Sequence, residues 1–192
     1  MGKENKSKYA LLGMLSLAPL SGYEMKKLVN TSIGHFWNES YPQIYPMLKQ
    51  LTQEGLTTSS IQKNEGRAES SVYRLTEQGW EELRHWLAEP FEYQIERNEL
   101  LLKLFFGSFA SIPINVEHIQ RHRSMQAQQL HTYEQTEADI RSRWSTHPHL
   151  PYWIMTLSYG KHIAQAMIEW CDETLITLEK MASDEKNNER NA

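Results

Sequence analysis

Apolar and polar positions in the first half of the chain predict three short helices followed by a β-hairpin. Apolar residues recur at helical spacing in three runs, which occupy residues 9–15, 25–29 and 44–51. Hydroxyl and β-branched residues then become frequent in two stretches, 56–62 and 71–75, on either side of the turn-forming residues 63–67. The hairpin is therefore expected to have a charged tip.

Short polar patterns mark where the helices begin. Ser21 with Glu24, and Ser40 with Gln43, each fit a capping box, in which a hydroxyl residue and an acid or amide three positions later bond each other's backbone amides. Thr76 is placed to begin a fourth helix. We expect that helix to bury three apolar side chains, those of Trp80, Leu83 and Leu87.

The third predicted helix has two distinct faces when its residues are spaced at about 100° each. Its apolar face consists of Ile44, Met47, Leu48 and Leu51. Its opposite face carries Tyr45, Pro46, Lys49 and Gln53. We expect the first face to enter a core and the second to face outward.

The second half of the chain predicts long helices. Between residues 116 and 144, positions at alternating steps of three and four form a heptad seam interrupted by polar residues, and a helix of this length spans about 42 Å. A last helix is expected over residues 152–182, where Gly160 and Ala164 are small enough for another helix to approach closely. The polar residues 183–192 are expected to be disordered.

These elements favour an α+β fold that is mainly α-helical. The order of helix, helix, helix and hairpin over residues 1–90 is typical of a winged helix-turn-helix domain, and residues 91–182 predict an all-α domain with long antiparallel helices. In a winged helix-turn-helix domain the third helix enters the major groove of DNA, and the hairpin contacts the backbone or the minor groove.

The charge is divided unevenly between the two halves of this 192-residue chain, whose net charge is −4. Residues 1–88 hold 10 basic and nine acidic residues, and residues 89–192 hold 10 and 15. A nucleic-acid site must therefore rest on a local cluster of cations rather than on the overall charge. Lysine and arginine side chains do occur on the protruding elements of the first half, although each one by itself is equally typical of a solvated surface.

Composition also limits where the protein acts. The single cysteine, Cys171, cannot form an internal disulfide, and no apolar run is long enough to span a bilayer. We expect a cytoplasmic protein without a membrane partner. Cys171 is expected to be buried as a small apolar residue.

A more specific signal comes from four blocks of residues in the first half. They read SGYEMKKL at 21–28, FW at 36–37, QIYPMLKQL followed by EGL over 43–56, and GR with YRLTEQG over 66–79. In this order and at this spacing they resemble the PadR family of transcriptional regulators. The string RNELLLKLFFG at 97–107 and the two long helices look like the C-terminal domain of the longer PadR-type proteins, a group that includes virulence activators.

The resemblance implies a sequence-specific regulator that binds double-stranded DNA as a homodimer, with each winged domain reading half of a near-palindromic operator; we expect repression. The resemblance and the cations on the protruding elements together predict a set of DNA-binding residues: Lys8, Lys26, Ser40, Tyr41, Gln43, Tyr45, Lys49, Lys63 and Arg67. Capping or packing explains Tyr41 and Gln43 equally well. The dimer is expected to be held by the C-terminal helices through Val116, Ile119, Leu130, Tyr133, Ile140, Trp144, Leu157, Ala164 and Met167.

Three tryptophans in the helical half, Trp144, Trp153 and Trp170, raise the hypothesis of a pocket for a small aromatic effector, since some PadR-type proteins respond to such compounds. Packing within the core or the dimer accounts for aromatic residues at this spacing as well. The sequence alone leaves both interpretations open.

No constellation of residues indicates an enzyme. His118 and His122 lie one helical turn apart, but the glutamate that a zincin places after the first histidine is missing, and we expect neither a metal nor a cofactor. The alternative function is a protein-interaction module that keeps the winged fold and dimerises without binding DNA. The two functions differ in their response to salt, because phosphate contacts weaken steeply as ionic strength rises.

Overall fold

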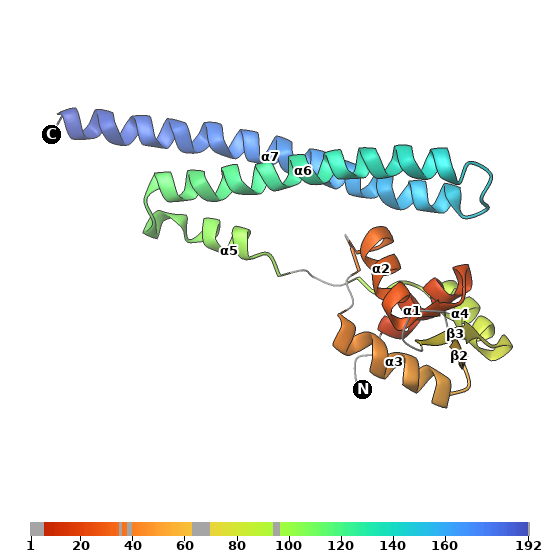
Figure 1. Cartoon of the computed structure of the whole chain (residues 1–192). Coiled ribbons are helices and arrows are strands. Elements are labelled where there is room, and N and C mark those ends of the chain that lie inside the picture. The colour runs from red at the N-terminus through yellow and green to blue at the C-terminus, as the bar shows by residue number, and fades with distance from the viewer. Residues whose placement is uncertain (1–5, 35, 38–39, 63–69, 94–96, 192) are drawn as a thin grey trace. The chain divides into compact units, whose positions relative to one another are not determined.

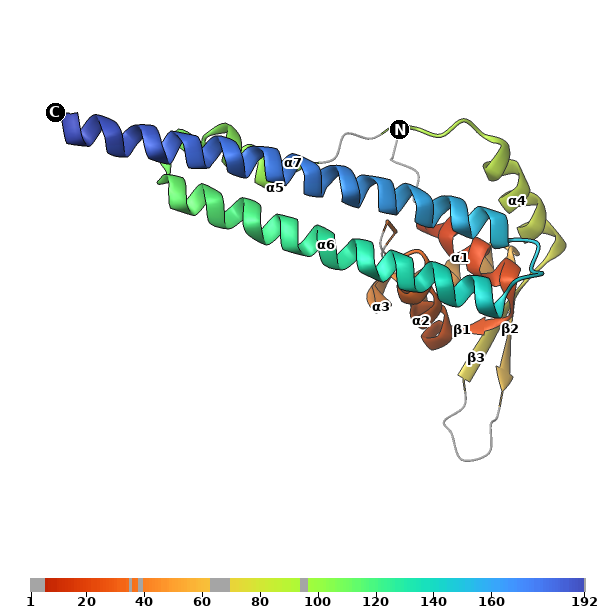
Figure 2. The same ribbon diagram turned by 90° about the horizontal axis from the view of Figure 1, so that it is seen from above.

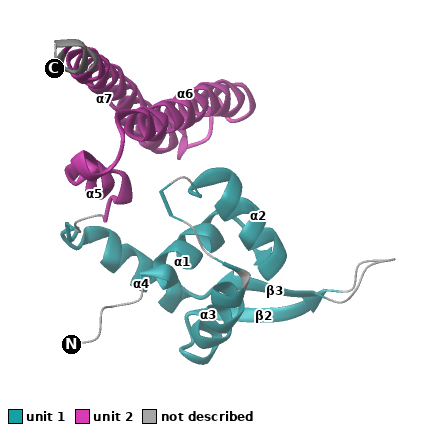
Figure 3. Cartoon of the chain, turned by 90° about the vertical axis from the view of Figure 1, so that its left-hand side faces the viewer, with its two compact units in different colours: residues 1–94 teal, residues 95–192 magenta. Residues whose placement is uncertain are grey.

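The computed structural model describes residues 6–34, 36–37, 40–62, 70–93 and 97–191. The chain divides into two compact units, Met1–Gln94 and Ile95–Ala192 (Figure 3). The sequence pattern placed this boundary at residue 90, and the structure places it four residues later.

The first unit is a winged helix-turn-helix fold, as the order of its elements predicted (Figure 1). Its elements are α1 (Ser7–Leu17), β1 (Leu20–Ser21), α2 (Gly22–Ser32), α3 (Tyr41–Gln53), β2 (Thr57–Gln62), β3 (Ser70–Leu75) and α4 (Glu77–Ala88). The three strands form an antiparallel sheet in the order β1-β3-β2, with Ser59 opposite Tyr73 in the hairpin. Strand β1 was not predicted, because two residues carry no periodic signal.

The predicted caps form in the first unit. The Ser21 amide donates to Glu24 Oε2 at 2.9 Å, and the Glu24 amide donates to Ser21 Oγ at 3.3 Å. The Gly79 amide donates to Thr76 Oγ1 at 3.0 Å. Each cap satisfies amides that the first turn of a helix leaves without intrahelical partners.

One face of α4 differs from the prediction. Leu83 is buried as expected, but the Trp80 and Leu87 side chains are 37% and 67% exposed. The helix packs instead through Gly79 and through Trp86, whose ring stacks on Tyr9 at a centroid distance of 4.5 Å. Gly79 lies so close to the Leu56 carbonyl that a Cβ would fall 2.1 Å from its oxygen. This close approach turns the Gly79 side of α4 toward the sheet.

The second unit is built on two long antiparallel helices, which Figure 2 shows side by side. Its elements are α5 (Glu99–Phe105), the short 3₁₀ helix η1 (Gly107–Phe109), α6 (Ile112–Arg143) and α7 (Leu150–Asn191). The ring of Tyr133 covers Gly160, where a Cβ would lie 2.7 Å from the Tyr133 Cζ. The small residue at 160 therefore permits the close helix approach that the sequence indicated.

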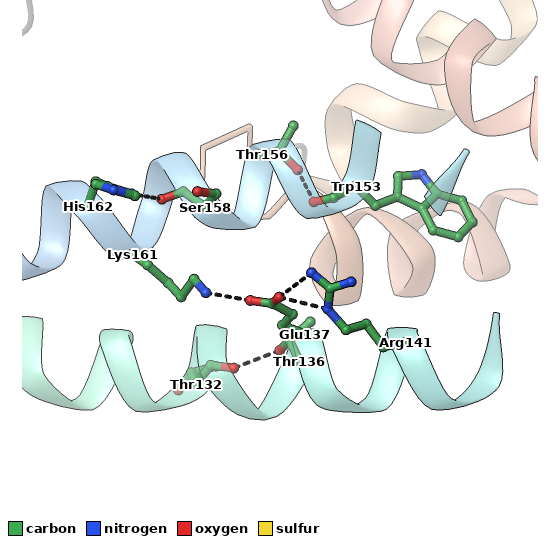
Figure 4. A network of polar contacts seen from close by, with 9 residues as sticks. All are labelled: Thr132, Thr136, Glu137, Arg141, Trp153, Thr156, Ser158, Lys161 and His162. Carbon is green, nitrogen blue, oxygen red and sulfur yellow. Dashed lines mark hydrogen bonds and ion pairs between the residues drawn. The ribbon is translucent and has the colours of Figure 1, made fainter. Parts of the chain in front are cut away.

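Polar pairs fix the register of α6 against α7. The Arg123 guanidinium donates from Nη2 to Asp172 Oδ2 at 3.1 Å, and this hydrogen bond lowers the pKa of Asp172. Glu137 accepts from both Lys161 and Arg141 (Figure 4). The hydrogen bond from Lys161 has the larger effect and that from Arg141 the smaller. Both hold the pKa of the Glu137 carboxyl below its ordinary value.

The heptad seam of α6 packs against α7 of the same chain, and the contacts expected between two copies stay a prediction. Ile119 and Tyr133 of α6 are buried together with Leu157 and Ala164 of α7. The partly buried residues Val116, Leu130 and Ile140 pack against the same two apolar clusters. A heptad pattern specifies that a helix has a partner, but the short connection between residues 143 and 150 supplies that partner from the same chain.

The polar residues 183–190 continue α7, which extends to Asn191. The sequence pattern ended this helix near Ala182, because apolar periodicity stops there. Residues 183–191 include two glutamates, a lysine and an arginine, which are strong helix formers, and no glycine or proline that would end the helix. None of the helices in the described part of the chain combines the length and apolar character that a bilayer crossing needs.

Candidate nucleic-acid interface

Helix α3 presents the polar face that the sequence predicted. Its four apolar residues enter the core of the first unit: Ile44, Met47, Leu48 and Leu51 are all buried. On the opposite side, Tyr45 is 48% exposed, and Pro46, Lys49 and Gln53 are exposed. The helix therefore holds a fixed set of outward groups on a rigid, well-packed base.

The start of α3 is organised by its cap. Ser40 donates from its backbone amide and from Oγ to Gln43 Oε1, at 3.0 and 2.7 Å. The carbonyl end of Gln43 is therefore engaged locally, as the capping interpretation of this residue requires. Near the other end, Gln50 Nε2 donates to Glu54 Oε1 at 2.7 Å.

Tyr45 is held in place by helix α2. Gly22, the first residue of α2, lies under the Tyr45 ring, and a Cβ at this position would fall 2.5 Å from Cε1 and 2.8 Å from Cζ. Gly22 was not among the residues predicted for the site. In the sequence Gly22 appears only as a glycine directly after the cap residue Ser21. Hydrophobic periodicity does not indicate that such a glycine contacts a residue on another helix.

The lysines predicted to bind DNA differ in how far they are exposed and in whether they have an acidic partner. Lys49 is exposed on α3 and has no acidic partner among the residues that the structure describes, whereas Lys26 is half-buried on α2. Lys8 packs on α4: its Nζ donates to Glu82 Oε1 at 2.6 Å and lies 4.7 Å from the centroid of the Tyr9 ring. The Lys8 ammonium group is therefore engaged by side chains of the first unit itself.

The Lys8–Glu82 pair also shifts both ionisation equilibria. Burial acts to lower the pKa of Lys8, but the hydrogen bond to Glu82 and the neighbouring Tyr9 raise it above its ordinary value. The hydrogen bond from Lys8 lowers the pKa of Glu82. Both shifts favour the charged pair, which joins α1 to α4.

The hairpin is described only along its strands. Lys63 and Arg67, together with the side chain of Tyr41, lie outside the described residues. Strand β2 exposes every residue after Thr57, including Ile61 at 69%. Hydroxyl groups of Thr58, Ser59 and Ser60 are therefore accessible on the strand that leads to the tip.

The three tryptophans of the helical half do not meet. Trp144 and Trp153 contact each other edge to face at 6.4 Å, with His147 stacked on Trp153 at 4.6 Å. Trp170 lies 17 positions further along α7, which places it about 25 Å away, and its ring contacts His122. One pocket lined by all three is therefore not formed within the chain. Met167, from the expected dimer contacts, is half-buried on α7, and Trp144 is 51% exposed.

Two remaining side-chain predictions concern metals and the cysteine. Across the residues that the structure describes, no group of three histidine, cysteine or acidic side chains is placed to hold a metal ion. Cys171 is fully buried in the apolar cluster between α6 and α7, and this burial raises the pKa of its thiol.

Comparisons with known proteins agree with this architecture. Residues 11–85 match the family model described as the transcriptional regulator PadR-like family, and residues 96–179 match the model described as the virulence activator alpha C-terminus. The negative transcriptional regulator PadR of Bacillus subtilis is 27% identical over 179 residues, which cover 90% of this chain and 97% of that protein.

Solved structures extend the likeness to the whole fold. The structure of Bacillus subtilis PadR with operator DNA superposes with a TM-score of 0.80 at 26% identity, covering 91% of this chain and 99% of that one. The same Bacillus protein with p-coumaric acid gives a TM-score of 0.75. The virulence activator AphA of Vibrio cholerae gives 0.72 at 26% identity, with 91% of this chain and 98% of that chain covered.

Proposed function

The chain belongs to the PadR-like family of transcriptional regulators, and from this premise we propose that it represses transcription by binding a near-palindromic operator as a homodimer. Each copy inserts α3 into the major groove of one half-site. The β2–β3 hairpin, with Lys63 and Arg67, follows the adjacent backbone. The relatives that bind DNA or act as named regulators share this fold over most of their length.

The observation that carries this proposal is the outward face of α3. Tyr45, Lys49 and Gln53 are exposed on a helix whose other side is fully packed. Amide and ammonium groups read base edges in the major groove, and a tyrosine hydroxyl or a lysine also contacts phosphates. Among the described residues the Lys49 ammonium group has no acidic partner, which suits contact with a polyanion, although the chain as a whole is acidic.

Selection of binding sites from a random duplex library with the purified full chain tests this function. Two-fold related half-sites are expected, with centres about one helical turn of DNA apart or a multiple of it. Affinity for the selected site should fall about tenfold or more between 50 and 200 mM salt. An interaction module that does not bind DNA would enrich no sequence, and that result would refute the regulator function.

Repression is the mode that the Bacillus relative supports, since that protein is named a negative regulator. A reporter gene placed behind the selected operator tests this part separately. Expression should fall when the protein is supplied and recover in an Lys49→Ala variant. Increased expression would assign the protein to the activators instead.

A small aromatic effector is the second part of the proposal, because the same Bacillus relative has been solved with p-coumaric acid. We propose that a phenolic acid of this kind releases the protein from its operator. Titration of the protein–operator complex with p-coumaric acid, followed by fluorescence anisotropy of labelled DNA, should show dissociation. Benzoic acid without the phenol serves as a control ligand.

A further inference from the structure

The turn between helix α3 and strand β2 joins the two elements that the proposed function brings to DNA. Helix α3 ends at Gln53, and Gly55 takes a left-handed conformation with a φ of 75°. The Gly55 amide donates to the Thr52 carbonyl at 3.2 Å, and the Leu56 amide donates to the Leu51 carbonyl at 2.9 Å. These are the two hydrogen bonds of a Schellman motif, so the chain leaves the helix in one defined direction.

The beginning of α4 also holds this turn. Thr76 donates from Oγ1 to the Gly55 carbonyl at 2.7 Å, and from its backbone amide to the Leu56 carbonyl at 3.1 Å. Gly79 packs against the Leu56 carbonyl so closely that a Cβ has no room there. The two carbonyls that follow α3 are therefore both engaged, and the turn cannot swing without breaking these bonds.

Two threonine hydroxyls connect the helix to the strand directly. Thr52 Oγ1 and Thr57 Oγ1 lie 2.9 Å apart, and Thr52 Oγ1 donates to the Leu48 carbonyl at 2.9 Å. Because a hydroxyl has only one proton to donate, the proton of the bond between the two threonines comes from Thr57. A directed chain of hydrogen bonds therefore runs from the first residue of β2 through Thr52 to the middle of α3.

Thr57 is the residue at which β2 leaves the core. It is 2% exposed, and the five residues that follow it in the strand are all exposed. A strand rises about 3.4 Å per residue, so Gln62 lies about 17 Å from Thr57, and a tilt of about 10° at Thr57 moves that end by about 3 Å. Such a shift is as long as a hydrogen bond. It would part the hairpin from a phosphate while α3 stays in the groove.

We propose that the Thr57 hydroxyl is a positioning group, which holds the β2–β3 hairpin at the distance from α3 that one duplex requires. This role rests on the proposed function, because it matters only where both elements contact the same DNA. Thr57 does not contact the DNA itself, since its side chain is buried. It acts through Thr52, whose acceptor, the Leu48 carbonyl, directly precedes the outward residue Lys49.

Removal of one hydroxyl at a time tests the direction of the chain. Thr57→Val keeps the shape of the side chain and leaves the Thr52 proton on the Leu48 carbonyl. Thr52→Val instead removes the acceptor of a buried hydroxyl, and a buried donor without an acceptor is costly. The melting temperature of Thr52→Val should therefore lie below that of Thr57→Val, and the double variant should recover part of the difference. The reverse order would overturn the chain and with it the role of Thr57.

Operator binding by the full-length chain tests the positioning role. In Thr57→Val the slope of log affinity against log salt should fall by up to about two, as expected if the two predicted hairpin cations, Lys63 and Arg67, lose their phosphates. Thr57→Ser keeps the hydroxyl and should keep the original slope. Thr58→Val is the matched control, because it makes the same substitution at the next residue of β2, which is exposed; its slope should not change.

A hairpin variant separates positioning from a general loss of stability. In a chain that already carries Lys63→Ala and Arg67→Ala, Thr57→Val should cause no further loss of affinity, because the contacts that it positions are absent. An equal loss in both backgrounds, or an unchanged slope in Thr57→Val alone, overturns the positioning role and leaves the regulator function intact. A wild-type chain that binds no duplex at low salt overturns the function itself, and the role of Thr57 with it.

Discussion

The Tyr45 ring of α3 rests on Gly22 of α2, with no space for a side chain between them. A Cβ on Gly22 would fall 2.5 Å from Tyr45 Cε1, well inside van der Waals contact. The first residue of α2 thereby sets the direction of an exposed side chain on α3. Through this contact the second helix of the fold controls a group at the proposed DNA surface.

Gly22→Ala should therefore weaken operator binding without unfolding the protein. The ring is half exposed and has room to rotate outward, so we expect an unchanged melting temperature. Loss of the Tyr45 contact should cost about 1 kcal/mol, near the lower end of what one specific contact contributes, or about fivefold in Kd. Fluorescence anisotropy with the selected operator measures this change.

A double mutant separates displacement of Tyr45 from other effects of the alanine. If Gly22→Ala acts through the ring, adding it to Tyr45→Ala should cause no further loss, because residues in contact give non-additive effects. Additive losses would show that Gly22 contributes to DNA binding by another route.

Lys49→Ala should reduce affinity for every duplex to a similar extent if the ammonium group contacts a phosphate. The slope of log affinity against log salt should then fall by about one. Lys63→Ala with Arg67→Ala should lower that slope further, because both cations belong to the predicted wing. Gln50→Ala is a control on the same helix, since removing a neutral amide leaves the slope unchanged.

Local patterns in the sequence predicted the frame of this site. The Ser21 and Ser40 boxes depend on residues three positions apart, and the buried face of α3 depends on spacing within one helix. Both were confirmed because the interactions that decide them are close in sequence. The residues that support Tyr45 were not predictable in the same way, because Gly22 and Tyr45 belong to different helices.

Long-range pairing explains the other differences. Lys8 was interpreted as part of a basic arm, but its partner Glu82 lies 74 positions away. The heptad seam correctly indicated that α6 has a helical partner and could not indicate which chain supplies it. Trp170 was grouped with Trp144 and Trp153 by residue type, although the length of α7 separates them.

The Lys8–Glu82 pair should stabilise the first unit without contributing to DNA binding. We expect Lys8→Met to lower the free energy of unfolding by about 1 kcal/mol, the upper end of the range for surface ion pairs, because the two side chains are only 22% and 32% exposed. Operator affinity and its salt dependence should remain unchanged. A loss of affinity at constant stability would return Lys8 to the DNA interface.

The same pair predicts the sign of a pH effect. The pKa of Glu82 is lower in the folded protein than its ordinary value of 4.5, so its contribution to stability is present above pH 4.5. It is lost as the pH falls through the folded-state pKa. Glu82→Gln should therefore flatten the acid limb of a plot of unfolding free energy against pH, and Glu81→Gln, at an exposed position of the same helix, is the matched control variant.

Two helical glycines provide a matched test of packing between α6 and α7. A Cβ on Gly160 would lie 2.7 Å from Tyr133 Cζ, whereas a Cβ on Gly13 of α1 would meet nothing within 4 Å. Gly160→Ala should therefore destabilise the protein by about 1–3 kcal/mol through overpacking. Gly13→Ala should stabilise it by about 0.5–1 kcal/mol, because alanine loses less conformational freedom in a helix. Chemical denaturation of both variants measures the difference, and equal effects would mean that Tyr133 is free to move away from α7.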